Sequence, residues 1–313
     1  MILVFDGHSD ILFDVTRRRL LGEERVLARR HLDRLRRGGV EGLILALWPG
    51  GDFWDTADPL RRMETTLACT QADLAQCPEF QLAVTAQEAE QARANGKIYV
   101  FLSVEGLSCL GTDLGRLEWL RAAGVTSAML TWNEENRLAA GAGADPKHGL
   151  TPLGREAVRR MEALGMTLDL SHLGKRSFWD ALDAAARPVI ASHSNCRALC
   201  PVPRNLTDAQ LSALRNAGGT VGLNSYHGFL HPDPTMQTAK TLACHALHMV
   251  EVMGVKHIAC GFDFCHFMGP GNESGTGLET AEKIPDFFHI LEDVGFTEAQ
   301  RKAIGRKNLL RMF

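Results

Sequence analysis

Short apolar runs alternate with amphipathic stretches along most of the chain. The apolar runs have the length and composition of buried strands, and we predict strands at residues 2–6, 42–48, 98–104, 127–131, 167–170, 189–192, 220–224 and 257–261. The stretches between them carry apolar residues at helical spacing. Several, such as LGRLEWLRAAG and LGREAVRRMEALG, end at a glycine, which commonly closes a helix. The pattern therefore predicts a series of strand–helix pairs.

Strands that alternate with helices form parallel sheets, because each crossover helix returns the chain to the same edge. Eight such pairs are the number in a (β/α)8 barrel. A doubly wound open sheet is the alternative, but the G-x-G-x-x-G fingerprint after a first strand is absent. No low-complexity linker divides the 313 residues. We therefore expect an α/β fold in which residues 1–313 form a single TIM-type barrel domain.

The composition is that of a globular enzyme, with 45% hydrophobic and 23% charged residues. A net charge of −3 provides no basic field for nucleic acid. The apolar run at residues 1–5 is too short for a signal peptide. No stretch reaches the roughly 18 apolar residues of a membrane span. The eight cysteines include no C-x-x-C pair and are expected to be reduced thiols. We expect a cytoplasmic protein without a nucleic-acid or membrane partner.

Polar residues gather where the predicted strands end. In a barrel of this type the chemistry lies on the loops at the carboxyl ends of the strands. Imidazole and carboxylate together suit Zn²⁺ and related divalent ions. The strand-end candidates for such a site are His8 and Asp10, Glu105, His172, His193, and Asp263.

The spacing of these residues suggests two metal ions. His8 and Asp10 are two residues apart, so in an extended segment both side chains point the same way. His172 and His193 are separated by one strand–helix repeat and would come from adjacent strands. Glu105 lies between these pairs in barrel order and could bridge two ions. Two metals can share and deprotonate a water while polarising a carbonyl, and Asp263 could carry the proton.

Each of these positions also has a structural alternative. The Asp-x-His-x-Asp segment could be a turn with capping carboxylates, and the lone glutamate could be a salt-bridge partner. A histidine at a strand end is often a core residue with satisfied hydrogen bonds. The matching places of two histidines on consecutive strands favour the metal site over these alternatives.

Taken together, the motifs resemble those of the membrane (renal) dipeptidase family, zinc metallopeptidases with an amidohydrolase-like barrel. The matching motifs are D-G-H-x-D at 6–10, E-G at 105–106, D-L-S-H at 169–172, S-H-S at 192–194, P-R-N at 203–205 and G-x-x-N-L at 305–309, so the resemblance spans the chain.

The resemblance implies a role for each of these residues. His8 and Asp10 would hold one zinc, and His172 and His193 the other. Glu105 would bridge the two, and Asp263 would lie beside the bridging water. Arg204 would bind the free carboxylate of a dipeptide, because a guanidinium fork matches a carboxylate. Tyr226 would be a neighbour of that carboxylate.

Two departures from the family pattern bear on the substrate. Relatives commonly read Leu-Thr-His after the fourth strand, where this chain has Trp132 and Asn133. An indole donates one hydrogen bond and carries no charge, so Asn133 or another loop would have to compensate. We expect Trp132 and Asn133 to bind the substrate together with Arg204 and Tyr226. Relatives also read Asp-Phe-Asp-Gly on the last strand, where this chain has Cys265 and His266 in the last two places. His266 is either a substrate-loop residue or an inert replacement. The tryptophan in place of the histidine of Leu-Thr-His suggests that the chain resembles a bacterial branch of the family.

We therefore expect a metal-dependent dipeptidase with two Zn²⁺ or other divalent ions per chain, whose substrates can include dipeptides with D-residues. Two alternatives remain open at the level of sequence. The same site could hydrolyse another small amide or a lactam, or the chain could be a catalytically silent metal-binding relative. The sequence also leaves open whether the protein forms a homodimer.

Overall fold

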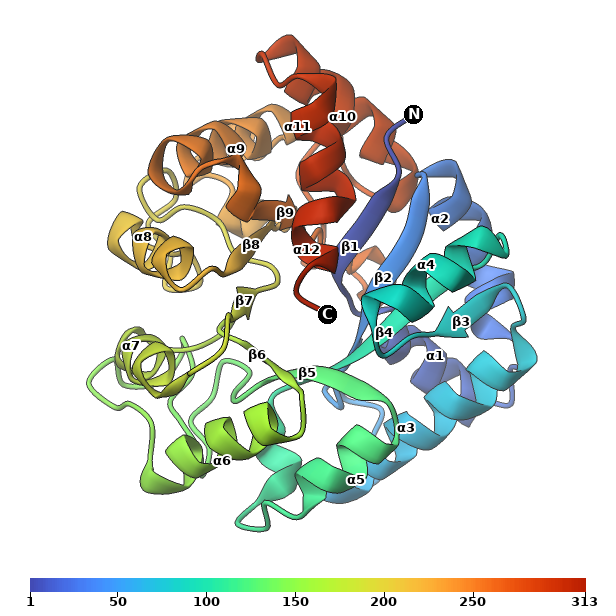
Figure 1. The fold of residues 1–313 in the computed structure, drawn as a ribbon. Helices are drawn as coiled ribbons and strands as arrows, with labels where there is room; N and C mark the ends of the chain where they lie inside the picture. Colours follow the sequence, from blue (N-terminus) through green and yellow to red (C-terminus); the bar gives the residue numbers. More distant parts are fainter.

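The computed structural model describes residues 1–313 as a closed barrel of parallel strands surrounded by helices (Figure 1). The ring runs β2-β1-β9-β8-β7-β6-β5-β4 and closes where β4 pairs with β2. Every strand pair in it is parallel, as the alternation of strands and helices predicts. The ring strands are β1 (Val4–Ser9), β2 (Val40–Leu47), β4 (Ile98–Glu105), β5 (Val125–Met129), β6 (Thr167–Asp169), β7 (Ile190–Ala191), β8 (Thr220–Leu223) and β9 (Ile258–Cys260). The prediction of a (β/α)8 barrel is confirmed, and each predicted strand overlaps one of these strands.

A ninth strand, β3 (Phe80–Leu82), was not predicted. It pairs with the first half of β4, from Ile98 to Val100, and β5 pairs with β4 only from Leu102 onward. The three residues of β3 are too few, and too exposed at Leu82, to give a buried-strand pattern. This strand therefore lies beside the ring and does not change its closure.

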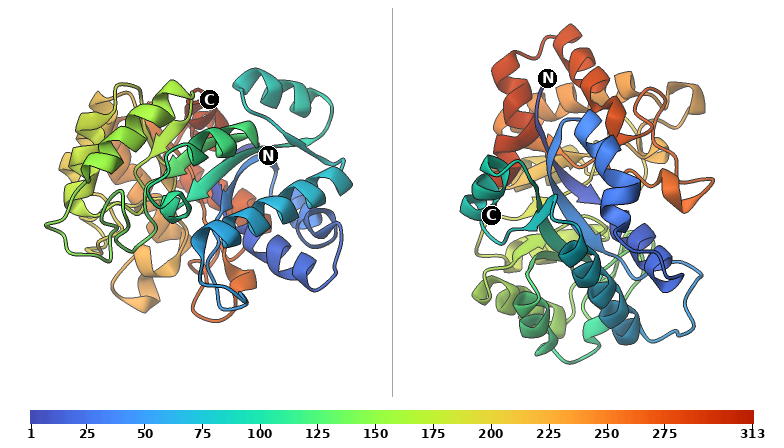
Figure 2. Two further views of the ribbon diagram at one scale, coloured as in Figure 1. Left: turned by 90° about the horizontal axis from the view of Figure 1, so that it is seen from below. Right: turned by 90° about the vertical axis from the view of Figure 1, so that its right-hand side faces the viewer.

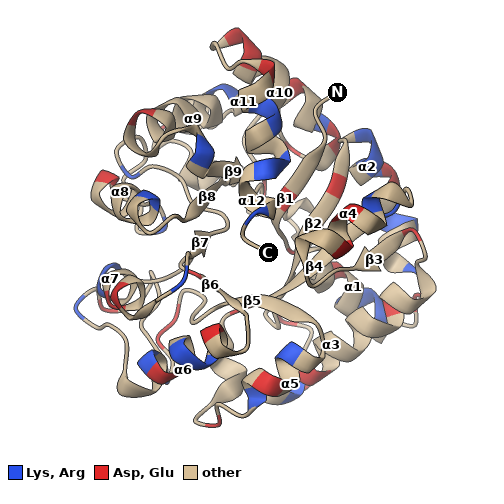
Figure 3. Cartoon of the chain, in the orientation of Figure 1, with Lys and Arg blue, Asp and Glu red and all other residues tan.

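The helices lie outside the strands, as the two side views in Figure 2 show. They are α1 (Ile11–Leu20), α2 (Leu32–Arg37), α3 (Pro59–Gln76), α4 (Ala86–Ala94), α5 (Arg116–Ala122), α6 (Pro152–Ala163), α7 (Lys175–Ala184), α8 (Asp208–Asn216), α9 (Ala239–Met253), α10 (Ile284–Asp293), α11 (Glu298–Lys302) and α12 (Asn308–Leu310). Acidic and basic residues are both spread over these outer helices (Figure 3). None of the helices combines the length and the apolar character that crossing a membrane would require.

Aromatic side chains fill the end of the barrel where β1 begins. Phe5, Phe101 and Phe313 form a cluster in which the ring of Phe313 lies 4.5 Å from that of Phe101 and 6.1 Å from that of Phe5. The C-terminus consequently lies in the middle of the ring (Figure 1). Because this end is closed by apolar packing, the polar residues of the barrel gather at the opposite end.

Main-chain atoms fill the interior near that polar end. A Cβ on Gly222 or on Gly261 would lie 1.8 Å from the carbonyl oxygen of Ser192. Ser192 directly precedes His193, so these glycines allow the neighbouring strands to approach the segment that carries a candidate ligand. Glycine is required at both positions because any side chain would displace the main chain.

We predict that Gly222→Ala destabilises the protein. The added methyl meets a buried carbonyl that cannot move aside, and such overpacking typically costs about 1–3 kcal/mol. The free energy of unfolding, measured by urea denaturation, should fall by that amount. Gly115→Ala is the matched control, since the nearest atom to its Cβ is a carboxylate oxygen of the flexible, exposed Asp113 side chain. Equal stability of the Gly222→Ala variant and the wild-type protein would contradict the prediction.

Candidate metal centre

The residues predicted from the strand ends converge at one end of the barrel. β1 carries His8 and is followed by Asp10, and β4 ends at Glu105. His172 follows β6, His193 follows β7, and Asp263 follows β9. β6 and β7 are neighbours in the ring, which brings the two histidines separated by one repeat next to each other.

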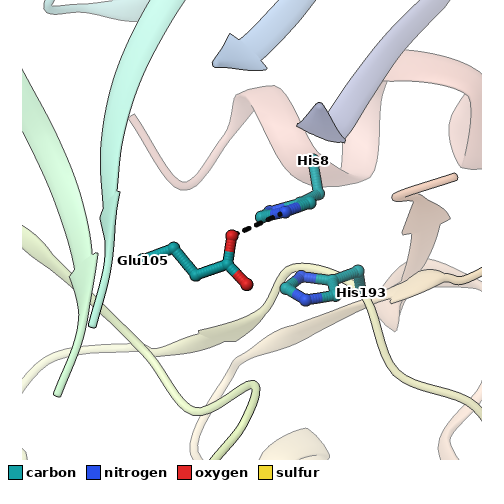
Figure 4. A group of neighbouring side chains, drawn as sticks. All are labelled: His8, Glu105 and His193. Atoms are coloured by element: carbon teal, nitrogen blue, oxygen red, sulfur yellow. Dashed lines mark ion pairs between the residues drawn. The ribbon is translucent and has the colours of Figure 1, made fainter. Parts of the chain in front are cut away.

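The carboxylate of Glu105 faces imidazoles on two sides. Its Oε2 lies 3.2 Å from His8 Nε2, and its Oε1 lies 2.9 Å from His172 Nε2. His193 completes the second side, because its Nε2 is 2.9 Å from His172 Nε2. The rings of His8 and His193 are stacked with their centroids 3.7 Å apart. Figure 4 shows how His8, Glu105 and His193 point toward one another.

Two further carboxylates approach His8. Asp10 Oδ1 lies 3.6 Å and Asp263 Oδ1 lies 3.8 Å from His8 Nε2. Ligand atoms of His8, Asp10 and Asp263 fall within 4.8 Å of one another, as do those of His8, Glu105 and His193. The structure therefore contains two overlapping groups that could hold a metal ion, and both include His8.

Several of these buried polar atoms make no hydrogen bond of suitable geometry, even where two of them lie close together. They are Nδ1 and Nε2 of His8, Oδ1 of Asp10 and Oε2 of Glu105. Leaving such atoms unsatisfied is costly, and a divalent cation would satisfy the three that face the cluster. Imidazole nitrogens and carboxylate oxygens are also the donors that zinc and similar ions accept. On this test the residues fit a divalent metal centre.

Burial dominates the electrostatics of the cluster. It raises the pKa of Glu105, and the nearby charge of Asp10 adds to the increase. It lowers the pKa of His172 and of His193, which favours the neutral imidazoles that bind metals. Burial lowers the pKa of His8 as well, but the carboxylates of Glu105 and Asp10 outweigh it and raise that pKa well above its ordinary value. A cation in the cluster would stabilise the ionised carboxylates and therefore lower their pKa values.

The outer nitrogens of two histidines are held by neighbouring side chains. Asn133 Oδ1 lies 3.0 Å from His172 Nδ1, and Ser192 Oγ lies 2.7 Å from His193 Nδ1. The amide oxygen of Asn133 can only accept, so it keeps a proton on Nδ1 of His172 and leaves Nε2 free toward Glu105. Ser192 was not predicted, although its place directly before His193 was a usable signal.

The backbone is unusual at two of the candidate residues. His172 and Asp263 have φ values of +67° and +60°, and Arg25 is the only other residue apart from glycine with a positive φ. These left-handed conformations are uncommon for residues with a side chain. They turn the chain sharply just after β6 and β9, where both side chains meet the cluster.

A cavity of about 480 Å³ opens beside the cluster. All four residues predicted for substrate binding line it, together with Asp10, Glu105, His172 and Asp263; the four are Trp132, Asn133, Arg204 and Tyr226. Its size is in the range of small-molecule sites. Tyr226 also donates a hydrogen bond from its hydroxyl to the carbonyl of Gly271, at 3.2 Å.

Arg204 is a buried cation in the cavity wall without an acidic partner. It is 8% exposed, its Nε has no hydrogen-bond partner, and its one hydrogen bond runs 3.5 Å from Nη2 to the carbonyl of His193. Its guanidinium lies over the ring of Phe229 at 5.4 Å. Burial lowers the pKa of Arg204 to about 10, so it stays charged at neutral pH. A buried, unpaired guanidinium facing a cavity is suited to bind an anionic group.

The two residues that depart from the family pattern on the last strand lie in different surroundings. Cys265 lines the cavity, and its thiol is 3.4 Å from Asp10 Oδ2 and 3.3 Å from Asp263 Oδ1. Burial raises the pKa of Cys265, so the thiol can donate to these carboxylates. His266 does not line this cavity and instead contacts the guanidinium of Arg34.

Comparison with known proteins is consistent with this geometry. The sequence pattern of membrane dipeptidases (peptidase family M19) matches residues 1–313. The fold is similar to that of a metallopeptidase from Rhodobacter sphaeroides solved with a phosphinate mimic of the dipeptide L-Ala-D-Ala. The TM-score is 0.87 with 26% identity, and the match covers 99% of this chain and 98% of that chain.

Two relatives in sequence extend the comparison. An uncharacterized dipeptidase from Schizosaccharomyces pombe is 37% identical over 228 residues, which are 71% of this chain and 54% of the relative. An uncharacterized protein from Klebsiella pneumoniae is 34% identical over 242 residues, which are 74% of this chain and 88% of the relative. The chain therefore belongs to the membrane dipeptidase family, peptidase family M19, and is a hydrolase of the metallodipeptidase class.

Proposed function

We propose that the chain hydrolyses dipeptides with a free carboxyl terminus at a centre of two Zn²⁺ or similar ions in a single barrel domain. The observation that carries this proposal is the carboxylate of Glu105, whose two oxygens face His8 on one side and His172 on the other. His8 and Asp10 would hold one ion, His172 and His193 the other, and Glu105 both. When bound, a pair of ions supplies a nucleophilic water and polarises the carbonyl that is attacked.

The remaining residues would bind the substrate and move a proton. Arg204 offers a buried and otherwise unpaired guanidinium to the free carboxylate, with Tyr226 in the same wall. Asp263 lies at the cavity beside His8 and accepts a 3.0 Å hydrogen bond from Asn224 Nδ2 to its Oδ2. Burial raises the pKa of Asp263, which suits a carboxylate that takes up a proton and returns it to the leaving amine.

Asn133 receives a positioning role in this proposal. Its amide oxygen fixes the proton on the outer nitrogen of His172, and such outer partners orient ligands for the metal. It also lines the cavity, so a substrate could contact its free amide group.

Asp263→Asn tests the proton carrier. The amide keeps the shape of the side chain but cannot accept the proton, so turnover of Ala-Ala should fall more than about a hundredfold. Metal content, measured by elemental analysis, should stay near two ions per chain. Asp183→Asn, on an exposed carboxylate, is the matched control. Retained turnover in the Asp263→Asn variant would remove Asp263 from its role.

Arg204→Ala tests carboxylate recognition. Loss of a hydrogen-bonded charge pair should raise the KM for Ala-Ala about ten- to hundredfold and leave kcat less affected. The sharper measurement compares Ala-Ala with its C-terminal amide, which lacks the negative charge. Wild-type protein should strongly prefer the acid, and the variant should lose that preference. Arg204→Lys keeps the positive charge without the two-pronged guanidinium, so its preference for the acid should lie between those of wild type and Arg204→Ala. An undiminished preference in Arg204→Ala would exclude this role.

Asn133→Ala tests the support of His172. Loss of an outer partner typically weakens metal binding about 10- to 100-fold, and competition with a chromophoric chelator should show this for one of the two ions. Asn272→Ala is the control, because Asn272 lines the same cavity but its side-chain amide donates a hydrogen bond to the carbonyl of Gly269. Unchanged metal affinity in Asn133→Ala would leave Asn133 as a substrate contact alone.

A further inference from the structure

A second hollow of about 380 Å³ adjoins the cavity beside the metal cluster. The two share Trp48, Glu105 and Trp132, and the second hollow contains none of the residues around Arg204. The space next to Glu105 therefore continues beyond the two indoles, on a side that Arg204 does not reach.

The order of the strands explains why two indoles flank Glu105. β2 and β5 both pair with β4, which ends at Glu105. Trp48 is the first residue after β2, and Trp132 follows shortly after β5. The ring centroids of Trp48 and Trp132 are 5.5 Å apart at an interplanar angle of 48°. The pair therefore forms a tilted aromatic wall where the two spaces meet.

Each indole has a further aromatic neighbour. The ring of Trp48 lies 5.7 Å from that of Phe13, and the ring of Trp132 lies 6.2 Å from that of His172. Trp132 is nonetheless 38% exposed, which is a large apolar area to leave in contact with water. An apolar group placed against it would remove that area from water.

The orientation of a bound dipeptide follows from the proposed function, on which this inference rests. With its carboxylate at Arg204 and its peptide bond near Glu105 and Asp263, its amino-terminal residue lies toward the indoles. We propose that Trp48 and Trp132 form the subsite for the amino-terminal side chain and select large apolar or aromatic residues there.

The charged residues of the second hollow do not favour one sign of charge in a substrate side chain. Apart from Glu105, which faces the metal cluster, they are Arg62 and Glu134, which have opposite signs and each make a hydrogen bond to a neutral group. Arg62 donates from Nε to the carbonyl of Thr56 at 2.6 Å, and Glu134 accepts from the Ser108 hydroxyl at 3.0 Å. Apolar contact with the indoles is therefore the property that distinguishes one substrate from another at this subsite.

The test compares kcat/KM for Phe-Ala, Ala-Ala and Ala-Phe with zinc-loaded protein. Phe-Ala should exceed Ala-Ala by about tenfold or more, since filling a hydrophobic pocket gives discrimination of that order. In Trp48→Ala the ratio of Phe-Ala to Ala-Ala should fall toward one, while the ratio of Ala-Phe to Ala-Ala should stay unchanged. Trp48→Phe should keep part of the preference. Trp179→Ala is the matched control, because Trp179 lies on α7 and lines neither space.

A binding measurement separates this proposal from the proposed function. Phosphinate mimics of Phe-Ala and Ala-Ala are titrated by calorimetry into zinc-loaded wild-type and Trp48→Ala proteins. The Phe-Ala mimic should bind wild type at least about tenfold more tightly than the Ala-Ala mimic does, and this difference should be lost in Trp48→Ala. If no dipeptide is hydrolysed, the proposed function is wrong. The ratio of the two Kd values then still tests whether the indoles bind the amino-terminal side chain, because binding does not require hydrolysis. Equal affinity of the two mimics for wild type, or an unchanged ratio in Trp48→Ala, overturns the subsite.

Discussion

The mouth of the barrel is organised around one buried carboxylate that faces imidazoles on both sides. Glu105 directs one oxygen to His8 and the other to His172, at 3.2 and 2.9 Å. Such a concentration of nitrogen lone pairs and carboxylates is unfavourable without a cation, because burial removes the water that would solvate it. The rest of the barrel mouth can be understood as the framework that keeps these groups together.

That framework includes buried carboxylates that accept hydrogen bonds from the backbone of neighbouring segments. Asp169 Oδ1 accepts from the backbone amides of Ser171 and Ser192, each at 3.0 Å, and so ties the segment after β6 to the segment after β7. Asp6 Oδ1 similarly accepts from the amide of Phe262 at 2.8 Å and joins β1 to the segment after β9. Candidate ligands on different strands are thereby held in register by carboxylates that do not themselves enter the cluster. Rigid support of this kind is what a preorganised site requires.

The departures from the family pattern are compatible with the same arrangement. Where relatives carry a second aspartate, the thiol of Cys265 lies between Asp10 and Asp263 and adds no negative charge to the cluster. Where relatives carry a histidine, Trp132 pairs with Trp48 at the edge of the cavity. The cluster of candidate ligands is complete in spite of both changes. The two replacements therefore alter the surroundings of the substrate and not the candidate ligands.

The sequence by itself determined the class of fold and the members of the cluster. Apolar runs separated by helical stretches predict parallel strands, and parallel strands in a barrel end at one mouth, so His8, Glu105 and His193 could be brought together from their places in the repeat alone. The short edge strand β3 gave no comparable signal, because only its first residue is buried.

Only the tertiary structure decided how these side chains face one another. The left-handed backbone of His172, the amide of Asn133 behind it and the absence of an acidic partner for Arg204 all depend on contacts between loops distant in sequence. The same holds for Trp48 and Trp132, which flank Glu105 because β4 lies between β2 and β5 in the closed ring. Periodicity reports which residues are buried along one strand, whereas the partners of a side chain at the mouth are set by how the barrel closes.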